Sequence, residues 1–313
     1  MKLVIVLEEK VLVSVCCTAF NHEKYIRDCL DGFVNQKTNF RYEVIVYDDA
    51  STDNSAIIIQ EYADKYPDII KPILQKENQY SKGIRISEKY IYPKCNGKYI
   101  AFCEGDDYWC DENKLQKQVD FLANNSDYIA CVHQTRMVNL RNNKSSLFVK
   151  HSKNSSIVAE EFFCSTIPFH LSSLMIKTDV FVERPSFCFI SKQVGDYPYG
   201  LYLALKGNIY FINDVMSVYR RFTEGSWSIK NVSKPNFELW EDMIKILTLA
   251  DEYSDFKYHK LVDKKKIGYE YKLWKHTAGF EVFNNERFKI LSASKKLKMI
   301  FYILCRKFGF HIK

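Results

Sequence analysis

Residues 98–109 read KYIAFCEGDDYW, an apolar run that ends in three carboxylates within four positions. Glu104, Asp106 and Asp107 directly follow KYIAFC, which has the short apolar pattern of a buried strand. Adjacent carboxylates repel each other, so Asp106 and Asp107 indicate either a polar turn, in which one of them caps the next helix, or a cation site. This stretch alone does not decide between the two.

Three earlier apolar runs have the same strand-like pattern, and predicted helices separate them. The segment 23–36, for example, places Ile26, Leu30, Phe33 and Val34 on one helical face. This alternation predicts a Rossmann-like α/β fold, with a mostly parallel central sheet flanked by helices on both faces. The other predicted strands are 11–18, 42–47 and 69–74, and the other predicted helices are 56–66, 83–95 and 111–125, the last capped by Asp111.

Polar clusters follow three of the predicted strands at their carboxyl ends. They are Thr18 to Asn21, Asp48 with Asp49, and Glu104 to Asp107. In parallel α/β sheets, ligands bind beyond the carboxyl ends of the strands. A surface turn has no reason to recur at this position three times, so the site interpretation outweighs the turn interpretation.

The pattern weakens after about Asn139, where 171–177, 208–214 and 218–222 could add strands to the same sheet. From Pro235 onward the spacing of apolar residues is helical. We therefore expect a catalytic or binding domain over residues 1–234 and a helical, basic C-terminal region over residues 235–313.

Composition narrows the classes of protein that the chain can belong to. It has 313 residues, 47% of them hydrophobic, and ten cysteines without a CxxC pair, which disfavours a structural zinc site and fits a reducing cytoplasm. The run LVIVL at 3–7 is too short for a signal-peptide core, and no apolar stretch approaches the length of a membrane span. The net charge of +7 comes from the tail, since 15 Lys and Arg face 7 Asp and Glu from Asp251 onward.

Four motifs in order resemble the family 2 glycosyltransferases, which have the GT-A fold. They are CTAFN (17–21), YDDASTDNS (47–55), GKYIAFCEGDDYW (97–109) and YRRFTEGSWS (219–228). The resemblance covers about residues 11–230. It implies an inverting enzyme that transfers a sugar from a nucleotide-diphosphate donor, a UDP-sugar, to a hydroxyl of a glycan or lipid-linked glycan, as in bacterial surface or capsular polysaccharide synthesis. It also implies Mn²⁺ or Mg²⁺, which would turn the repulsion between Asp106 and Asp107 into attraction.

The resemblance also assigns roles to individual residues. Thr18 and Phe20 resemble the pair that lines the uracil pocket, and Asn21 belongs to the same nucleotide-binding motif. The sequence-based site is completed by Asp49 toward the uracil N–H, Asp106 toward the ribose and the metal, and Asp107 as a direct metal ligand, while Asp48 serves either the site or the turn.

The chain departs from the family pattern at two places. Cys17 replaces the Pro that usually precedes the Thr-Tyr-Asn motif of the family, and Ala19 stands inside that motif. Phe222 occupies the common basic or His position of the last motif, which puts a diphosphate contact from there in doubt. Arg220 or Arg221 could replace it, although an Arg beside a strand is more often a surface ion-pair partner.

An inverting transfer also needs a carboxylate base near the acceptor hydroxyl. Asp196 follows Gly195 and opens a predicted helix in QVGDYPYGLYLALKG (193–207), which is where the family places this base. A plain helix cap is the alternative role for Asp196, and Asp179 and Asp214 are the fallback candidates for the base. His133 and His170 are expected to be structural, and Trp227 either floors the sugar site or belongs to the core.

Three rival functions are weighed against a glycosyltransferase. A nucleotidyltransferase would need a Gly-rich basic loop after the first strand, which AFNHEKY lacks. A non-catalytic glycan- or partner-binding module on a degenerate GT-A scaffold would not need Asp49, Asp106, Asp107 and Asp196. A nucleic-acid binder is suggested only by the basic tail. That tail also suggests peripheral docking on an anionic membrane, at the inner face of the plasma membrane, or packing on the catalytic domain.

Overall fold

The computed structural model describes residues 10–149, 151–164, 167–224 and 235–308. The chain divides into two compact units. The first comprises Met1–Val158, Ile167–Arg184 and Lys206–Val232, and the second comprises Ala159–Thr166, Pro185–Leu205 and Ser233–Lys313. The second unit thus takes in two segments from before residue 234, and the predicted division of the chain at residue 235 stays a prediction.

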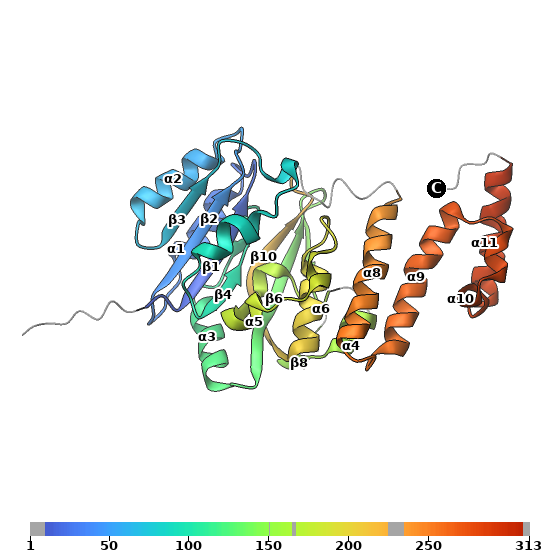
Figure 1. Ribbon diagram of the computed structural model, residues 1–313. Helices are drawn as coiled ribbons and strands as arrows, with labels where there is room; N and C mark the ends of the chain where they lie inside the picture. The colour runs from blue at the N-terminus through green and yellow to red at the C-terminus, as the bar shows by residue number, and fades with distance from the viewer. Residues whose placement is uncertain (1–9, 150, 165–166, 225–234, 309–313) are drawn as a thin grey trace, which may run out of the picture. The chain divides into compact units, whose positions relative to one another are not determined.

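The N-terminal half of the first unit is a parallel sheet with strand order β3-β2-β1-β4 (Figure 1). These strands coincide with the four predicted ones. Their bounds are β1 Val13–Ala19, β2 Tyr42–Asp48, β3 Ile70–Leu74 and β4 Tyr99–Phe102. The connecting helices are α1 Ile26–Val34 and α2 Ser55–Lys65. Two consecutive helical turns, Ser87–Ile91 and Tyr92–Lys94, lie in the segment 83–95 that was predicted to be helical, and a separate turn, Tyr80–Lys82, precedes it.

Beyond β4 the sheet continues as β9-β6-β10-β5, and most of the added pairs are antiparallel, so the whole sheet is mixed. β10, Asn208–Arg221, is one long strand with irregular register near Ile212 and Val215, where the sequence suggested two separate strands. The other elements here are β5 Tyr108–Trp109, α3 Lys114–Asn124, β6 Tyr128–Asn139, β7 Lys144–Leu147, β8 Ser155–Ile157, the turn Leu171–Ser173, β9 Met175–Lys177 and α5 Thr178–Val182.

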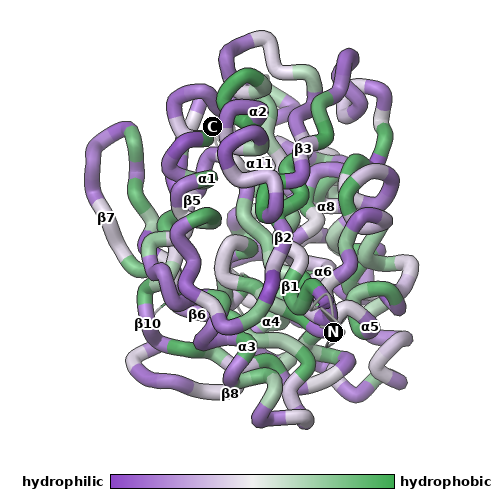
Figure 2. The backbone as a smooth tube through the Cα atoms, turned by 90° about the vertical axis from the view of Figure 1, so that its left-hand side faces the viewer, coloured by the Kyte–Doolittle hydropathy of each residue, from purple (hydrophilic) through white to green (hydrophobic). Residues whose placement is uncertain are grey.

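Two features explain why the sequence pattern weakens after Asn139. β7 is exposed along its whole length and pairs only with the end of β6. The hairpin of β6 and β7 projects from the sheet and is largely hydrophilic in Figure 2. A ribbon with both faces in water needs no alternation of apolar and polar residues, so it gives no strand signal.

One hydrophobic core joins the parallel strands to α1 and fixes the segment after the acidic loop. Phe33 on α1 packs edge-on against Trp109 of β5, with 4.8 Å between the ring centroids. A side chain at Gly32 would approach the carbonyl of Trp109 to 2.7 Å, so the small residue lets α1 lie against β5. The loop 103–107 is therefore held between β4 and a packed tryptophan.

The second unit is built from helices, as predicted for the C-terminal region. α8, α9 and α11 lie in sequence beside one another, from orange to red in Figure 1. No helix among the described residues is long and apolar enough to cross a membrane. The helical elements of this unit are α4 Ala159–Cys164, the turn Ser186–Phe189, α6 Asp196–Lys206, α8 Phe237–Tyr253, α9 His259–Thr277, the turn Phe280–Asn284, α10 Glu286–Lys289 and α11 Ala293–Lys307.

Candidate active site

The acidic loop lies at the carboxyl end of β4, beside the end of β1. The N–H of Cys103 donates to the carbonyl of Cys16 and that of Gly105 donates to the carbonyl of Thr18, over 3.1 and 2.8 Å. A Cβ atom at Gly105 would lie 2.9 Å from both His22 and Ile26, so the loop approaches α1 more closely than a side chain permits. Glu104, Asp106 and Asp107 can present carboxylate oxygens that all lie within 4.8 Å of one another.

Neither aspartate of the pair caps the next helix, because α3 begins only at Lys114. Asp111, which was predicted to cap that helix, does not do so. The residue directly before the helix is Asn113, and the Asp111 carboxylate accepts the N–H of Asn113 over 2.8 Å. The helix-cap explanation of Asp106 and Asp107 is therefore excluded, and the cation explanation remains.

Asp107 is completely buried, and only one of its carboxylate oxygens is satisfied. Oδ1 accepts the backbone N–H of Arg220 over 2.8 Å, whereas Oδ2 has no hydrogen-bond partner within the described residues. Burial, followed by repulsion from Asp106, raises the carboxyl pKa of Asp107 well above its ordinary value. A buried anion with an unsatisfied oxygen is costly. A bound cation would supply the missing partner, so Asp107 fits the predicted role of metal ligand.

Asp106 is held by two residues from the end of β10. Its Oδ2 accepts the hydroxyl of Thr223 over 2.7 Å, and its backbone carbonyl accepts the guanidinium of Arg220 over 3.0 Å. The Asp106 side chain is thereby oriented beside Asp107, as two ligands of one cation must be. Glu104 is exposed and completes the carboxylate cluster.

Arg220 braces this loop instead of reaching into open solvent. Its guanidinium also pairs with Asp28 of α1 and lies 4.4 Å from the ring centroid of Tyr108, and its side chain is only 11% exposed. Arg221 lies over the ring of Phe222, whose φ of 68° is in the left-handed region. Arg220, one of the two candidates for the diphosphate contact, thus uses its guanidinium for contacts within the protein.

His170 faces the unsatisfied oxygen of Asp107, although the sequence suggested only a structural role. Its Nε2 lies 3.8 Å from Asp107 Oδ2, and its ring stacks on Tyr219 with 4.2 Å between the centroids. Its Nδ1 lies 2.8 Å from the hydroxyl oxygen of Ser172 and 3.3 Å from the backbone nitrogen of the same residue. Burial lowers the pKa of His170 to about 3, which keeps the ring neutral.

The predicted nucleotide-binding loops after β1 and β2 are tied to each other. The N–H of Asn21 donates to Ser51 Oγ over 2.9 Å, and Asn21 Oδ1 accepts the N–H of Thr52 over 2.8 Å. Asn21 has a φ of 57°, a conformation that asparagine tolerates better than most residues. Phe20 is 44% exposed, as a residue whose ring stacks on a base must be.

Asp49 is buried and anchors the segment after β3. Its Oδ1 accepts the N–H of Gln79 over 2.8 Å and the hydroxyl of Tyr47 over 3.0 Å, and its Oδ2 accepts the N–H of Tyr80 over 3.0 Å. Asp48 instead accepts both the N–H and the hydroxyl of Ser51, which is the turn role considered for it. Thr18 contributes its carbonyl to the acidic loop, so Thr18, Phe20, Asn21 and Asp49 gather at the edge that carries Asp106 and Asp107.

His22, which the sequence argument passed over, also lies at this edge. Its N–H donates to Ser55 Oγ over 2.8 Å, while its ring Nδ1 has no hydrogen-bond partner among the described residues. Burial lowers the pKa of His22, opposed by the negative charges of Asp106 and Asp53. Its position directly after the CTAFN motif is the sequence feature that could have identified it as a site residue.

The candidates for the base are dispersed. Asp196 is an exposed residue at the start of α6 in the second unit, and its Oδ1 accepts the N–H of Tyr197 over 2.8 Å. Asp179 follows β9, which runs antiparallel to β4, so it lies at the opposite sheet edge from Asp107. Asp214 forms an ion pair with Lys117 and precedes Arg220 by six positions on β10, about 15–20 Å along the strand. Both fallback residues are therefore remote from the cluster, and Asp196 stays a prediction.

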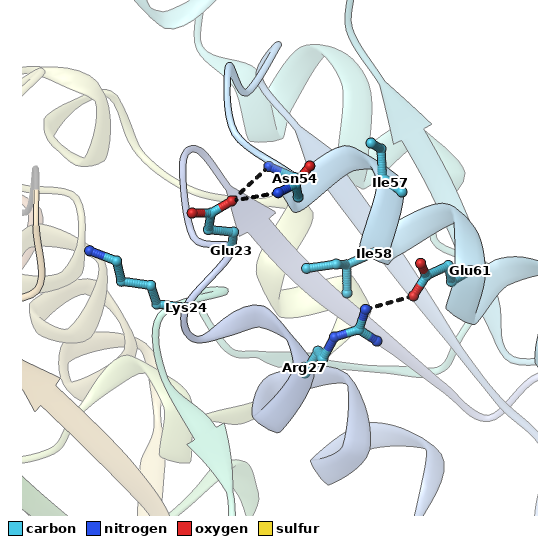
Figure 3. Close-up of a pocket in the computed structure, with 7 residues that line it drawn as sticks. All are labelled: Glu23, Lys24, Arg27, Asn54, Ile57, Ile58 and Glu61. Carbon is cyan, nitrogen blue, oxygen red and sulfur yellow. Dashed lines mark hydrogen bonds and ion pairs between the residues drawn. The ribbon is translucent and has the colours of Figure 1, made fainter.

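A pocket between α1 and α2, shown in Figure 3, is not the candidate site. Its charged side chains are engaged with neighbours: Arg27 pairs with Glu61 over 2.8 Å, and Glu23 accepts both the N–H and the side-chain amide of Asn54 over 3.0 Å. Trp227, considered for the sugar site, lies outside the described residues, as do positions 225–228 of the fourth motif.

Comparison with known proteins decides the family. Residues 14–194, more than half of the chain, match the sequence model of glycosyl transferase family 2. The chain belongs to glycosyl transferase family 2. A relative in Mycobacterium tuberculosis, the uncharacterized protein Rv1520, is 34% identical over 231 residues, which are 73% of this chain and 64% of the relative. The chain thus spans less than two thirds of that relative's length.

Two further proteins, one compared by sequence and one by structure, are similar to this family 2 member. The Escherichia coli enzyme WfgD, a UDP-Glc:alpha-D-GlcNAc-diphosphoundecaprenol beta-1,3-glucosyltransferase, is 29% identical over 115 residues, which are 37% of this chain and 42% of WfgD. Staphylococcus aureus TarS, solved with UDP-GlcNAc, aligns with a TM-score of 0.64 at 16% identity over 93% of this chain and 79% of that structure. This similarity confirms the predicted GT-A-type α/β fold.

Proposed function

We propose that this family 2 protein is a metal-dependent, inverting glycosyltransferase that uses a UDP-sugar. Its acceptor is a hydroxyl of a glycan or lipid-linked glycan of the cell surface. The single observation that carries this proposal is the buried Asp107 carboxylate, whose Oδ2 lacks a hydrogen-bond partner among the described residues, next to Asp106 and at the same sheet edge as Phe20 and Asp49. WfgD, a sequence relative that uses UDP-Glc, supports the choice of donor and acceptor class.

Asp107 and Asp106 would hold the cation, with Glu104 beside them. Mn²⁺ and Mg²⁺ prefer such hard oxygen ligands, and a bound divalent ion would neutralise the charge that develops on the departing diphosphate. Phe20 would stack on the uracil ring, while Asp49 fixes the loop of Gln79 and Tyr80 around it. Thr223 and Arg220 would keep Asp106 in its ligand orientation.

In the transfer itself, we assign Asp196 the role of base. Its carboxylate would take the proton of the acceptor hydroxyl while that oxygen bonds to the anomeric carbon of the sugar. The bond from this carbon to the diphosphate breaks on the opposite face, so the configuration inverts and UDP leaves with the bonding electrons. The aspartate then returns the proton to solvent.

A screen of sugar nucleotides tests this proposal. The full chain is incubated with Mn²⁺ and UDP-, GDP- and dTDP-sugars, and release of the free nucleoside diphosphate by slow hydrolysis is measured. We expect release of UDP from a UDP-sugar. The Asp107→Asn variant should abolish this release, whereas Asp120→Asn, which changes an exposed aspartate of α3, should preserve it. Nucleotide binding without any release would instead support a binding module, and release only from a GDP- or dTDP-sugar would refute the assigned donor base.

A further inference from the structure

The last described helix, α11 (Ala293–Lys307), carries two apolar faces. One of them packs inside the second unit, where Met299 and Ile303 are buried. Their neighbours in this small core come from α9 to the start of α11 and are Ile267, Ala278, Val282, Phe288 and Leu291. This face accounts for the folding of the helix onto its unit, which needs no second apolar face.

The second face is an exposed stripe of large apolar side chains. Leu297, Phe301, Leu304 and Phe308 are 66%, 61%, 39% and 72% exposed. Their spacing of four, three and four residues puts them within roughly 60° of the helix circumference, opposite Met299 and Ile303, at about 100° per residue. We call these four residues the α11 stripe. Packing within the described chain leaves the stripe in water, which indicates an external partner.

The charges around the stripe identify the kind of partner. Lys298 lies on one side, and Lys296 and Lys307 lie on the other, each roughly 90° around the helix from the centre of the stripe. The helix contains no acidic residue. The remaining cations point toward the packed side: Lys295 lies over the ring of Tyr271, and the Arg306 guanidinium donates to the carbonyls of Lys275 and Ala278.

An apolar stripe between two rows of lysines fits the surface of an anionic bilayer. The lysine stems can lie along the acyl boundary while their ammonium groups reach the lipid phosphates. A helix of this length extends about 22 Å, less than the roughly 30 Å of a hydrocarbon core, so it would lie in the interface. Pairing of two copies through the stripe would instead bring the flanking lysines of both copies together, and like charges oppose that contact.

We propose that α11 docks the protein on an anionic lipid surface. The α11 stripe enters the boundary between headgroups and acyl chains, and Lys298 contacts the lipid phosphates. Lys296 and Lys307 join it when they leave their contacts with the carbonyl of Lys289 and the ring of Phe280. Docking by this helix is independent of the glycosyl transfer proposed above, so either proposal can fail alone. One face of α11 packs within the second unit, and the proposal assigns the other face to the membrane.

Vesicle co-sedimentation of the full chain tests the docking. Vesicles contain either phosphatidylcholine alone or an equal mixture with phosphatidylglycerol, at 50 and 500 mM salt. We expect binding to the anionic vesicles at low salt, at least about tenfold weaker in Leu297→Gln/Phe301→Gln and in Lys298→Glu/Lys307→Glu. The matched controls are Val182→Gln, which is 75% exposed on α5, and Lys144→Glu on exposed β7; both should bind like the wild type.

A gain-of-signal variant keeps the test independent of damage to the fold. In Phe301→Trp the new indole replaces an exposed ring, and lipids brominated in the acyl chains should quench its fluorescence beyond the quenching of the wild-type tryptophans. Equal quenching of both proteins overturns the proposal. Equal sedimentation of the wild type and the stripe variants also overturns the proposal. A third contrary result is a dimer, detected by light scattering, that Leu297→Gln/Phe301→Gln dissociates without any effect on vesicle binding, because the stripe would then serve dimerisation alone.

Discussion

The backbone N–H of Arg220 donates a hydrogen bond to Asp107 Oδ1 over 2.8 Å, across 113 positions of sequence. The same residue reaches Asp106 and Asp28 with its guanidinium. One arginine at the end of β10 thus fixes both aspartates of the acidic loop and ties the loop to α1. The geometry of the candidate metal site depends on strand pairing far from it in the sequence.

Replacing Arg220 by alanine should loosen the loop while leaving the backbone bond to Asp107. The loss of the hydrogen bonds that the charged guanidinium donates, a part-buried one to Asp106 and an exposed one to Asp28, should lower the free energy of unfolding by about 1–2 kcal/mol. Thermal denaturation measures this, and UDP binding in the presence of Mn²⁺ should weaken in parallel. Arg221→Ala is the control for a neighbouring arginine and should have little effect on stability. Equal destabilisation by the two variants would contradict the bracing role of Arg220.

Thr223→Val should weaken metal binding specifically. The substitution keeps the shape of the side chain but removes the hydroxyl that donates to Asp106 Oδ2 over 2.7 Å. Loss of a partner that orients a metal ligand reduces metal affinity by roughly 10–100-fold. A titration of Mn²⁺ at saturating UDP measures the shift, and Thr248→Val on α8, which removes a hydroxyl bonded within its own helix, should cause none. An unchanged Mn²⁺ requirement would exclude Asp106 from the metal site.

The burial of Lys114 should make the free energy of unfolding increase with pH just above neutrality. It is fully buried, donates to Gln118 over 2.8 Å and lies 3.9 Å from the Trp109 ring centroid. Burial lowers its pKa from 10.5 to about 7 in the folded protein. Between these two values the unfolded chain binds the extra proton, so the free energy of unfolding increases with pH by up to about 1.4 kcal/mol per unit.

Comparison with Lys114→Met isolates this contribution between pH 7 and 8.5. The stability of the wild type relative to Lys114→Met should rise over this range, because the variant lacks the group that must lose its proton on folding. Chemical denaturation at each pH gives the difference. The exposed control Lys71→Met should show a constant offset. A difference between wild type and Lys114→Met that does not change with pH would show that Lys114 keeps its charge inside the fold.

Asp196→Asn separates the two roles suggested for that residue. As the base, Asp196 is needed for proton transfer but not for binding the donor, so turnover should fall by roughly 100-fold or more while UDP-sugar affinity stays within about twofold. As a helix cap alone, the change would be nearly silent, since Asn caps as well as Asp. Initial rates with a competent acceptor, together with calorimetric donor binding, distinguish the two outcomes, and an active variant would remove Asp196 from the mechanism.

The sequence predicted the parallel half of the sheet because its strands are apolar on both faces and short turns bound them. It did not reveal β6, Tyr128–Asn139, whose interior contains the buried polar residues His133, Gln134 and Thr135. Thr135 exchanges a hydrogen bond with Ser217 of β10, and Gln134 donates to the carbonyl of Val149. Tertiary partners satisfy the side chains of Gln134 and Thr135, and no local pattern discloses such partners.

The same limit applies to the candidate site. Asp106 and Asp107 could be predicted because the charge cluster is local and stands at a strand end. His170 and Thr223 could not, since only the packing of β10 and the turn before β9 brings them to the acidic loop. Arg220 was recognised as a motif residue, but its role as a brace depends on Asp28 and Tyr108, which come from two other elements.

Calorimetric titration of UDP, with and without Mn²⁺, tests most directly whether Asp107 belongs to a metal-dependent nucleotide site. For wild type and Asp120→Asn we predict UDP binding at least about tenfold tighter with Mn²⁺ than with EDTA. For Asp107→Asn this gain should vanish, while the fold is kept because the substitution removes an unpaired buried charge. UDP binding that is equally tight in EDTA, or a gain that survives in Asp107→Asn, would contradict the assignment of Asp107 as a metal ligand.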